Sequence, residues 1–256
     1  MQKLKPLVSP LILFALWEIA ARLGWIEVKF FPAPTTIFAR MFQMLGTAQF
    51  WTDLGLSLQR AGIGMLMGGV PGVLVGLAMG LFKPVRDFLQ PLVAGLYPLP
   101  KIAILPLLLL IFGLGEMSKY VTVAIGVFFI MVINTSAGVL AIRPIYFDVA
   151  KSLHASRWQT YATVALPGAL PGIFTGIRLA TGVALLLLVS AEFVGANEGL
   201  GYVILQANGN IDTAMLFAAL IIMSVLGIAL FAIMLTSKDP QAGPGEMILA
   251  SGPLLV

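Results

Sequence analysis

The sequence predicts an all-α polytopic membrane protein with about six transmembrane helices and a cytoplasmic helix-turn-helix. The first observation is composition: 59% of the residues are hydrophobic and only 10% are charged, whereas soluble domains carry roughly a quarter charged residues. The second is a series of nearly charge-free runs that, with their flanks, reach the ~20 residues needed to cross a bilayer. The third is one polar stretch between two such runs, residues 148–171, which must lie in water.

The predicted spans follow the charge-free runs in order along a transmembrane domain of residues 1–236. They cover residues 7–23, 59–82, 88–114, 119–142, 171–194 and 213–236. A cleaved signal peptide is the alternative for the first run, but its length and the lack of a clean cleavage site favour an uncleaved span. We expect a loop at residues 24–58 with an amphipathic piece at 36–45, and a disordered tail at residues 237–256.

The basic residues predict the orientation. With the N-terminus inside, the inner side holds roughly eight Lys and Arg residues and the outer side roughly five. Both termini and the polar stretch are therefore expected in the cytoplasm. The net charge of +4 comes from scattered bases, which favours positively charged loops over nucleic-acid binding.

Two spans carry unusual small or rigid residues. The second contains a ladder of glycines spaced four apart, and a shorter ladder opens the fifth; the ladders are Gly64, Gly68, Gly72, Gly76 and Gly80, then Gly168, Gly172 and Gly176. Such a face favours close helix packing within the subunit, with a moving or dimer-forming contact as the alternative. The third span carries four prolines between residues 91 and 106, which predict a broken helix and favour equally a plain kink or a wall of a substrate path.

Two basic residues lie near the middle of predicted spans. Lys101 is near the middle of the third span and Arg178 is midway along the fifth. A central basic residue costs about 2.5–3.5 kcal/mol on insertion scales, so each should face a cavity or a partner. Glu18 and Glu192 are the possible acidic partners. Structural ion pairing is one interpretation, and a positive path for small anions is the other.

The predicted substrate path includes further polar side chains from the same spans. Asn134 and its neighbours Thr135 and Ser136 favour interhelical hydrogen bonds over ligand contact. The residues we assign to the path are Tyr97, Lys101, Asn134, Arg178 and Glu192. The glycine-rich residues 193–202 lack the strand-then-helix setting of a phosphate-binding loop, and we expect an outer turn or gate there.

The polar stretch is predicted to fold as two short helices. Asp148 favours a helix start and residues 149–153 can form the first helix. A turn is needed at His154. Ser156 and Gln159 have the spacing of a capping box, which opens the second helix.

The second short helix has an aromatic face and a defined end. Trp158 and Tyr161 are three residues apart and should share that face. Pro167 is expected to end or kink the helix before the next span. The alternative is an ordinary amphipathic loop on the membrane surface.

The polar stretch resembles the cytoplasmic coupling loop of ABC importer permeases. That pattern begins Glu-Ala-Ala, has glycine four residues later and closes with Leu-Pro. Here the corresponding residues are Asp148, Val149, Ala150, His154, Leu166 and Pro167. Histidine replaces the glycine of the turn, where a left-handed backbone is useful, and it is among the better-tolerated substitutes there.

Shorter motifs along most of the chain resemble the nitrate/sulfonate/taurine-type permeases. They are Pro32-Ala-Pro34, Ser57-Leu-Gln-Arg60, Pro98-Leu-Pro100, Phe112-Gly-Leu-Gly-Glu116, Thr175-Gly-Ile-Arg178, Ala191-Glu192 and Gly199-Leu-Gly-Tyr202. The resemblance implies a type I ABC importer permease fold in a bacterial inner membrane. It also implies import of a small anion such as nitrate, a sulfonate or taurine.

The resemblance further implies the partners: a cytoplasmic ABC ATPase, an extracytoplasmic binding protein and a second permease copy in a homodimer. The coupling segment, residues 143–167, would contact the ATPase. Its coupling residues would be Asp148, Ala150, His154, Ser156, Arg157, Trp158, Gln159, Tyr161 and Pro167.

Two other functional classes have weaker support. A secondary transporter would need an internal repeat and mid-membrane carboxylates for coupling ions, and neither is clear. An intramembrane enzyme would need a nucleophile–base pair or a metal cluster, whereas the chain has no cysteine and one histidine. No ATP-binding loop is present in the sequence, so we expect no cofactor on this chain and ATP and Mg²⁺ on the partner ATPase.

Overall fold

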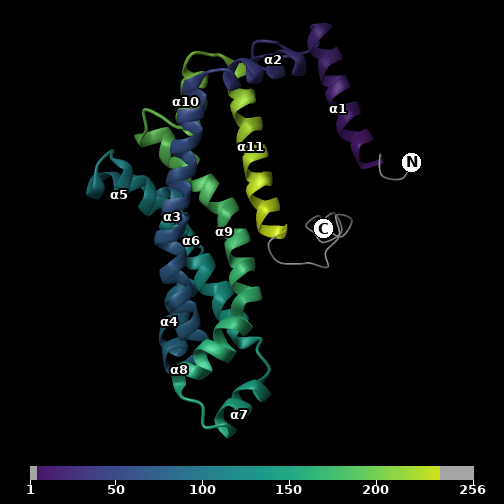
Figure 1. The fold of residues 1–256 in the computed structure, drawn as a ribbon. Helices are drawn as coiled ribbons and strands as arrows, with labels where there is room; N and C mark the ends of the chain where they lie inside the picture. The colour runs from purple at the N-terminus through teal and green to yellow at the C-terminus, as the bar shows by residue number, and fades with distance from the viewer. Residues whose placement is uncertain (1–4, 237–256) are drawn as a thin grey trace. The chain divides into compact units, whose positions relative to one another are not determined.

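The computed structural model describes residues 5–236, and within them every regular element is helical (Figure 1). Residues 1–4 and the predicted tail at 237–256 lie outside the described part. The helices are α1 Lys5–Arg22, α2 Pro34–Leu45, α3 Ala48–Leu81, α4 Lys83–Leu96, α5 Leu105–Phe112, α6 Glu116–Leu140, α7 Pro144–Ser152, α8 Arg157–Thr160, α9 Leu166–Gly195, α10 Leu200–Gly209 and α11 Thr213–Thr236. A 3-10 turn forms at Lys101–Ile104 and a π-helical turn at Tyr161–Ala165.

The predicted spans are recognisable in the helices. Within residues 5–236, four stretches are long and apolar enough to cross a membrane: Ala48–Leu81, Glu116–Leu140, Arg157–Gly195 and Thr213–Ile233. Helix α4 and the stretch Lys101–Phe112 add a fifth if that bent pair is one span. Helix α1 coincides with the predicted first span, but three charged residues among its 18 place it outside this set.

The third span is broken, as its prolines predict. Helix α4 tolerates Pro91 in its interior, but it ends at Leu96. Pro98 and Pro100 follow within four residues, and neither has a backbone N–H to continue the helical hydrogen-bond ladder. The chain resumes as the 3-10 turn at Lys101–Ile104 and then as α5.

Two boundary predictions need correction. The amphipathic piece is present as α2, but α3 begins at Ala48 rather than near residue 59. The glycine-rich loop is shorter than expected, because Leu200–Gly209 forms a helix, α10. Local glycine content suggested a loop there, whereas contacts from distant residues stabilise the start of this helix.

The described residues divide into two compact units. The first comprises the chain up to Gly68 with Pro98–Val127 and Val183–Val225, and the second comprises Gly69–Tyr97, Phe128–Gly182 and the chain from Leu226. Helices α3, α6, α9 and α11 contribute residues to both units.

The glycine ladder of α3 packs against α6 in each unit. In the first unit, Gly64 and Gly68 face Val123 and Ala124. In the second, a β-carbon added at Gly72 or Gly76 would lie 2.7 Å from the β-carbon of Met131 or Thr135, too close for any real side chain. The prediction of close packing within the subunit is therefore confirmed. The contacts advance in the same direction along both helices, so these parts of α3 and α6 run parallel.

The shorter ladder on α9 packs against the same helix within the second unit. A β-carbon at Gly172 would approach the carbonyl oxygen of Asn134 to 2.6 Å and the Cα of Gly138 to 2.7 Å. Later residues of α9 contact earlier residues of α6, from Gly172 on Gly138 to Gly176 on Met131, so this pair is antiparallel. The close approach of the backbones brings the start of α9 against the end of α6 and positions the segment between them.

Candidate functional site: the coupling segment, its cavity and a buried ion-pair network

The coupling segment folds as the predicted helix-turn-helix, but its first helix starts earlier than expected. Helix α7 begins at Pro144, and Arg143 precedes it in an extended conformation. Proline at the first helical position supplies a fixed φ and loses no hydrogen bond. Asp148 is thus inside the helix rather than at its start. Its exposed carboxylate lies 3.6 Å from Lys151 Nζ.

The turn is left-handed at His154, as predicted. His154 has φ +54°. Its amide donates to the Lys151 carbonyl at 2.9 Å, and the Ala155 amide donates to the Ala150 carbonyl at 2.9 Å. These two bonds form a Schellman motif, which usually has glycine at the position of His154. The turn therefore keeps both hydrogen bonds of the motif, and histidine in the left-handed conformation adds some backbone strain.

The capping box at the start of α8 is confirmed. The Gln159 amide donates to Ser156 Oγ at 3.2 Å, and the Ser156 amide donates to Gln159 Oε1 at 2.7 Å. Reciprocal bonds of this kind satisfy two amides that a helix N-terminus otherwise leaves open. The capping box therefore fixes Arg157 as the first residue of the helical stretch that continues through the π turn into α9.

The coupling segment exposes large apolar side chains. Trp158 stacks on Tyr161 with ring centroids 5.2 Å apart and an interplanar angle of 18°. Trp158 is 73% exposed and Leu153 is 76% exposed, and Arg157 is exposed beside them. An exposed cluster of an aromatic ring, a large aliphatic side chain and arginine is typical of a protein contact surface.

Of the two outcomes predicted for Pro167, an end of the second helix does not occur. The stretch Arg157–Gly195 is one continuous helical stretch, with Pro171 inside α9. Directly before Pro167, the chain makes the π turn at Tyr161–Ala165, and the Leu166 amide donates to the Tyr161 carbonyl five residues back. The wider turn re-routes the hydrogen bonds around the proline, and such π turns are common at functional sites.

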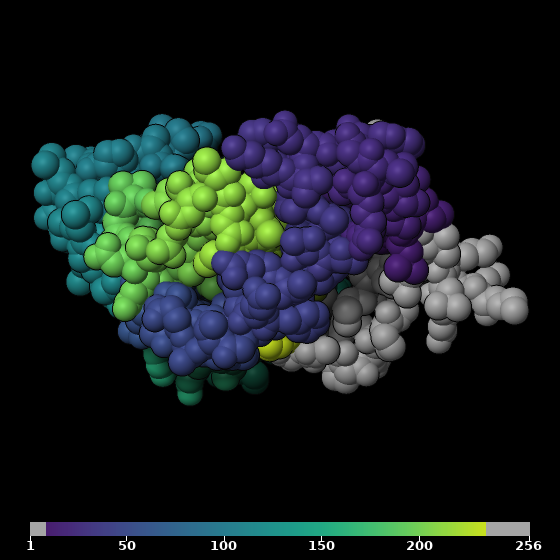
Figure 2. Space-filling view, turned by 90° about the horizontal axis from the view of Figure 1, so that it is seen from above, coloured from purple at the N-terminus to yellow at the C-terminus, as the bar shows by residue number. Residues whose placement is uncertain are grey.

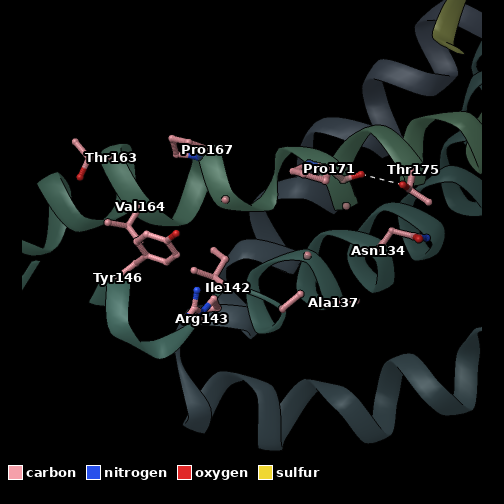
Figure 3. A pocket seen from close by; sticks show the side chains of 14 residues that line it. Asn134, Ala137, Ile142, Arg143, Tyr146, Thr163, Val164, Pro167, Pro171 and Thr175 are labelled. Carbon is pink, nitrogen blue, oxygen red and sulfur yellow. Dashed lines mark hydrogen bonds between the residues drawn. The ribbon is translucent and has the colours of Figure 1, made fainter. Parts of the chain in front are cut away.

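A cavity of about 710 Å³ lies in the second unit between the end of α6, the start of α7, the π turn and the start of α9. Figure 3 shows the Tyr146 ring extending between Val164 and Arg143, while Pro167 and Pro171 lie along the α9 side. Asn134, from the predicted path, is at the other end, where its side-chain amide donates to the Ile130 carbonyl at 2.9 Å. Both Asn134 and Pro167 thus line one cavity.

Arg178 lies within the membrane-spanning part of α9, and its guanidinium sits over the Phe231 ring of α11 at 5.6 Å from the centroid. Its Nε is buried and has no hydrogen-bond partner in the described part of the chain. The expected acidic partners lie elsewhere: Glu18 binds Arg22 at 2.6 Å, and Glu192 binds Arg60 at 2.8 Å. The predicted pairing of Arg178 with either acid is therefore wrong.

Tyr97 and Lys101, the remaining predicted path residues, flank the break in the third span. Tyr97 follows the last residue of α4 and is 46% exposed. Lys101 opens the 3-10 turn and is partly buried. Both positions belong to the irregular backbone that the prolines create.

A buried ion-pair network occupies the first unit. Arg60 Nη1 donates to Glu192 Oε1 at 2.8 Å, and Arg60 Nε donates to Glu116 Oε2 at 2.6 Å. Lys119 Nζ joins Glu116 at 2.8 Å. The Glu192 side chain is fully buried and that of Arg60 is 4% exposed. Each buried charge is therefore compensated by an opposite charge and by hydrogen bonds, which is the condition for burying it.

The network caps the start of α10. The backbone amides of Gly199, Leu200 and Gly201 donate to Asp53 Oδ1, Ser57 Oγ and Glu192 Oε2 at 2.7, 2.9 and 2.8 Å. Acidic and hydroxyl groups at a helix N-terminus satisfy its open amides and its dipole. In Figure 2 the residues after α9 (yellow-green) lie between the start of α3 (blue) and α5 (teal). The network therefore attaches the segment after α9 to α3.

The model of one protein family matches residues 72–240, which include the coupling segment and the cavity. That family is described as the binding-protein-dependent transport system inner membrane component. The chain belongs to this family. The predicted recognition as an ABC importer permease is therefore confirmed, and the molecule is a membrane-spanning permease subunit.

Relatives of this permease extend the similarity to nearly the whole chain. A Bacillus subtilis protein named for aliphatic sulfonates transport, SsuC, is 35% identical over 88% of this chain and 81% of its own. The taurine transport system permease protein TauC of Escherichia coli is 33% identical over 86% of this chain and 82% of its own.

Solved ABC transporter structures share the fold of this permease. A permease chain of the MetNI methionine transporter in inward-facing conformations has a TM-score of 0.59 at 20% identity, over 75% of this chain and 97% of that chain. A bacterial alginate importer gives 0.64 at 16% identity, over 94% and 92%. The predicted type I importer permease fold is therefore confirmed.

The buried network of this permease escaped prediction from the sequence, apart from Glu192. A signal was present: Asp53, Ser57 and Arg60 are spaced four and three residues apart, so they share one face of a helix. Polar residues with this spacing in an otherwise apolar stretch indicate an inward-facing polar stripe. Glu192, assigned to the substrate path, lies within this network with both carboxylate oxygens occupied.

Proposed function

We propose that this permease imports a small anionic solute of the sulfonate class, with taurine and aliphatic sulfonates ahead of nitrate. The observation that carries the proposal is Arg178, whose guanidinium has no acidic partner within residues 5–236. An unpaired cation in the membrane is costly unless an anion or water reaches it. The names of two relatives, for aliphatic sulfonates and taurine transport, agree with a passing anion.

Energy would come from a separate cytoplasmic ATPase, which binds the ATP and Mg²⁺. The coupling segment supplies the contact through Leu153, Arg157 and the stacked Trp158–Tyr161 pair, supported by their exposure and by family membership. A binding protein outside the membrane would deliver the solute, as in the alginate importer solved with its periplasmic protein.

The assembly would be a homodimer of this permease in a bacterial inner membrane with both termini in the cytoplasm. The bias of Lys and Arg toward the side of the coupling segment supports this orientation. The rival function, a transporter driven by an ion gradient, would require no ATPase and no exposed coupling segment.

Uptake into proteoliposomes tests the proposal. The permease is reconstituted with its ATPase and binding protein, ATP is enclosed on the ATPase side, and radiolabelled taurine or ethanesulfonate is supplied outside. We expect uptake with ATP and none with a proton or sodium gradient alone; uptake driven by a gradient alone would establish the rival function.

Two substitutions test the anion path in the same assay. Arg178→Ala and Lys101→Ala should each reduce uptake at least tenfold, while Arg178→Lys retains part of it because the charge remains. Correct insertion is checked by protease accessibility of the coupling segment. Unchanged uptake from both alanine variants would rule out the anion path.

A further inference from the structure

The cavity beside the coupling segment has the lining of a site for an amphiphilic anion. Its fourteen lining residues include one cation, Arg143, and no carboxylate. Most of the others are apolar or small, among them Ala137, Ile142, Val164 and Pro171. A ligand with several charges or many polar groups would lose more hydration here than the lining returns.

The cationic hydrogen-bond donor of the cavity, Arg143, lies at one end beside the Tyr146 phenol. Thr163 Oγ1 already donates to the Gln159 carbonyl at 2.7 Å and Thr175 Oγ1 to the Pro171 carbonyl at 2.8 Å. Arg143 and Tyr146 make no side-chain hydrogen bond or ion pair within residues 5–236, and both face the cavity in Figure 3. A guanidinium with an adjacent phenol is suited to a sulfonate or phosphate head.

The rest of the cavity suits an apolar chain. Ala137, Gly138 and Ala141 follow Asn134 at helical spacings along the end of α6, and Pro167 and Pro171 lie opposite on α9. From Asn134 to Ala141 this wall is about 10 Å long at 1.5 Å per residue. A charged head at Arg143 would therefore leave an alkyl chain against an apolar wall.

We propose that this cavity binds an amphiphilic monoanion, with its sulfonate or phosphate head at Arg143 and Tyr146 and its alkyl chain along α6 and α9. That the ligand is a sulfonate rests on the proposed function, whereas the preference of the cavity for an amphiphilic monoanion rests on its lining alone. Two sources share this chemistry: a transported alkanesulfonate and an anionic lipid. The site is distinct from Arg178, which does not line the cavity.

Occupancy of the cavity would be linked to the coupling segment. Thr163 and Val164 belong to the π turn and line the cavity, and Tyr146 belongs to α7. Conversion of the π turn to an α-helical turn would rotate the residues before it by about one residue, near 100°. A bound ligand that contacts both α7 and the π turn would hold one arrangement and so slow the ATPase cycle.

Binding is measured by calorimetry on the purified permease in phosphatidylcholine nanodiscs, with alkanesulfonates from ethane- to hexanesulfonate and butanol as the uncharged probe. Affinity should rise with chain length and be absent for butanol. Arg143→Gln should weaken binding about tenfold or more. Ala137→Leu should weaken the binding of the longer alkanesulfonates most, because the larger side chain would occupy the space along α6 that their alkyl chains need. The controls are Arg86→Gln and Ala94→Leu, both in α4 and outside the cavity lining, which should bind as the unaltered protein does.

A photoreactive alkanesulfonate locates the site without substitutions, and we expect cross-links within residues 134–146 and 163–175. Repeating the titration in phosphatidylglycerol nanodiscs distinguishes the sources, since a resident lipid would compete and weaken sulfonate binding in proportion to its content. Cross-links elsewhere, or equal affinity in Arg143→Gln and Arg86→Gln, would overturn the proposal. Sulfonate binding at the cavity without sulfonate uptake by the complex would refute the proposed function alone, and uptake with no cavity binding would refute this inference alone.

Discussion

In the first unit, Arg60, Glu116 and Glu192 satisfy one another inside the protein, whereas in the second unit Arg143, Tyr146 and Arg178 have no polar side-chain partner among the described residues. Saturated buried charges stabilise one arrangement, because any displacement leaves a charge uncompensated. Open polar groups and an exposed aromatic pair are available to other molecules. The first unit therefore anchors the segment after α9, while the second carries the groups to which the proposals above assign ligand and ATPase contacts.

The largest expected effect is loss of the anchor. Arg60→Met should destabilise the protein by about 3–5 kcal/mol, because Glu192 would remain buried without its cation. Thermal unfolding of the purified permease in detergent measures this. Lys151→Met, which breaks the exposed pair with Asp148, is the control and should cost about 1 kcal/mol or less. Equal losses from the two variants would contradict the contrast between the units.

The second effect concerns the exposed aromatic pair. Trp158→Ala should weaken binding of the ATPase by about 2 kcal/mol or more, as buried aromatic anchors at interfaces do, while leaving the unfolding temperature of the permease unchanged. Trp25→Ala is the matched control, since Trp25 is 75% exposed in the first unit. Co-purification and ATPase rate measure the result, and a fall in unfolding temperature without loss of binding would assign Trp158 to the fold instead.

Glycines on one helix should respond with opposite signs. Gly72→Ala should destabilise the permease by about 1–2 kcal/mol, because its methyl group would enter α6. Gly62→Ala, with nothing within 4 Å of its β-carbon, should stabilise α3 by about 0.5–1 kcal/mol. Unfolding temperatures of the two variants decide this, and a stabilising Gly72→Ala would show that the α3–α6 contact is looser than described.

The smallest expected effect is relief of strain at the turn. His154→Gly should be neutral or stabilise the protein by up to about 1 kcal/mol, because glycine adopts φ +54° without penalty. Ile211→Gly is the companion variant in the first unit, where a β-branched residue has φ +57°. Unfolding and ATPase stimulation are measured together, and a clear loss of stimulation in His154→Gly would show that the imidazole itself takes part in coupling.

Local patterns predicted the coupling segment well. The capping box and the left-handed turn depend on residues within seven positions of one another, so the sequence contains all the interacting groups. The start of α7 was missed because Pro144 outweighs Asp148 as a helix initiator. The π turn was missed because proline is usually read as a stop, and a re-routed hydrogen-bond ladder has no simple sequence signature.

Contacts between distant residues were predicted less well. Glu192 was offered as a possible partner of Arg178 or Lys101, the two basic residues near the middle of predicted spans, yet its partner is Arg60, 132 residues away. The segment that forms α10 was predicted as a loop from its glycine content. The groups that cap the start of this helix, Asp53 and Ser57, lie far away in the chain and could not be identified from the local sequence.

The sequence by itself determined the membrane class, the spans from α3 onward, the break at Pro98 and Pro100, and the coupling segment. Hydrophobic length, proline chemistry and capping act over a few neighbouring residues and depend little on the rest of the fold. Only the tertiary structure decided which charges neutralise one another, which glycines meet α6 and where a cavity remains. Those outcomes depend on which helix faces come together, because burial makes every polar group dependent on the partner it meets there.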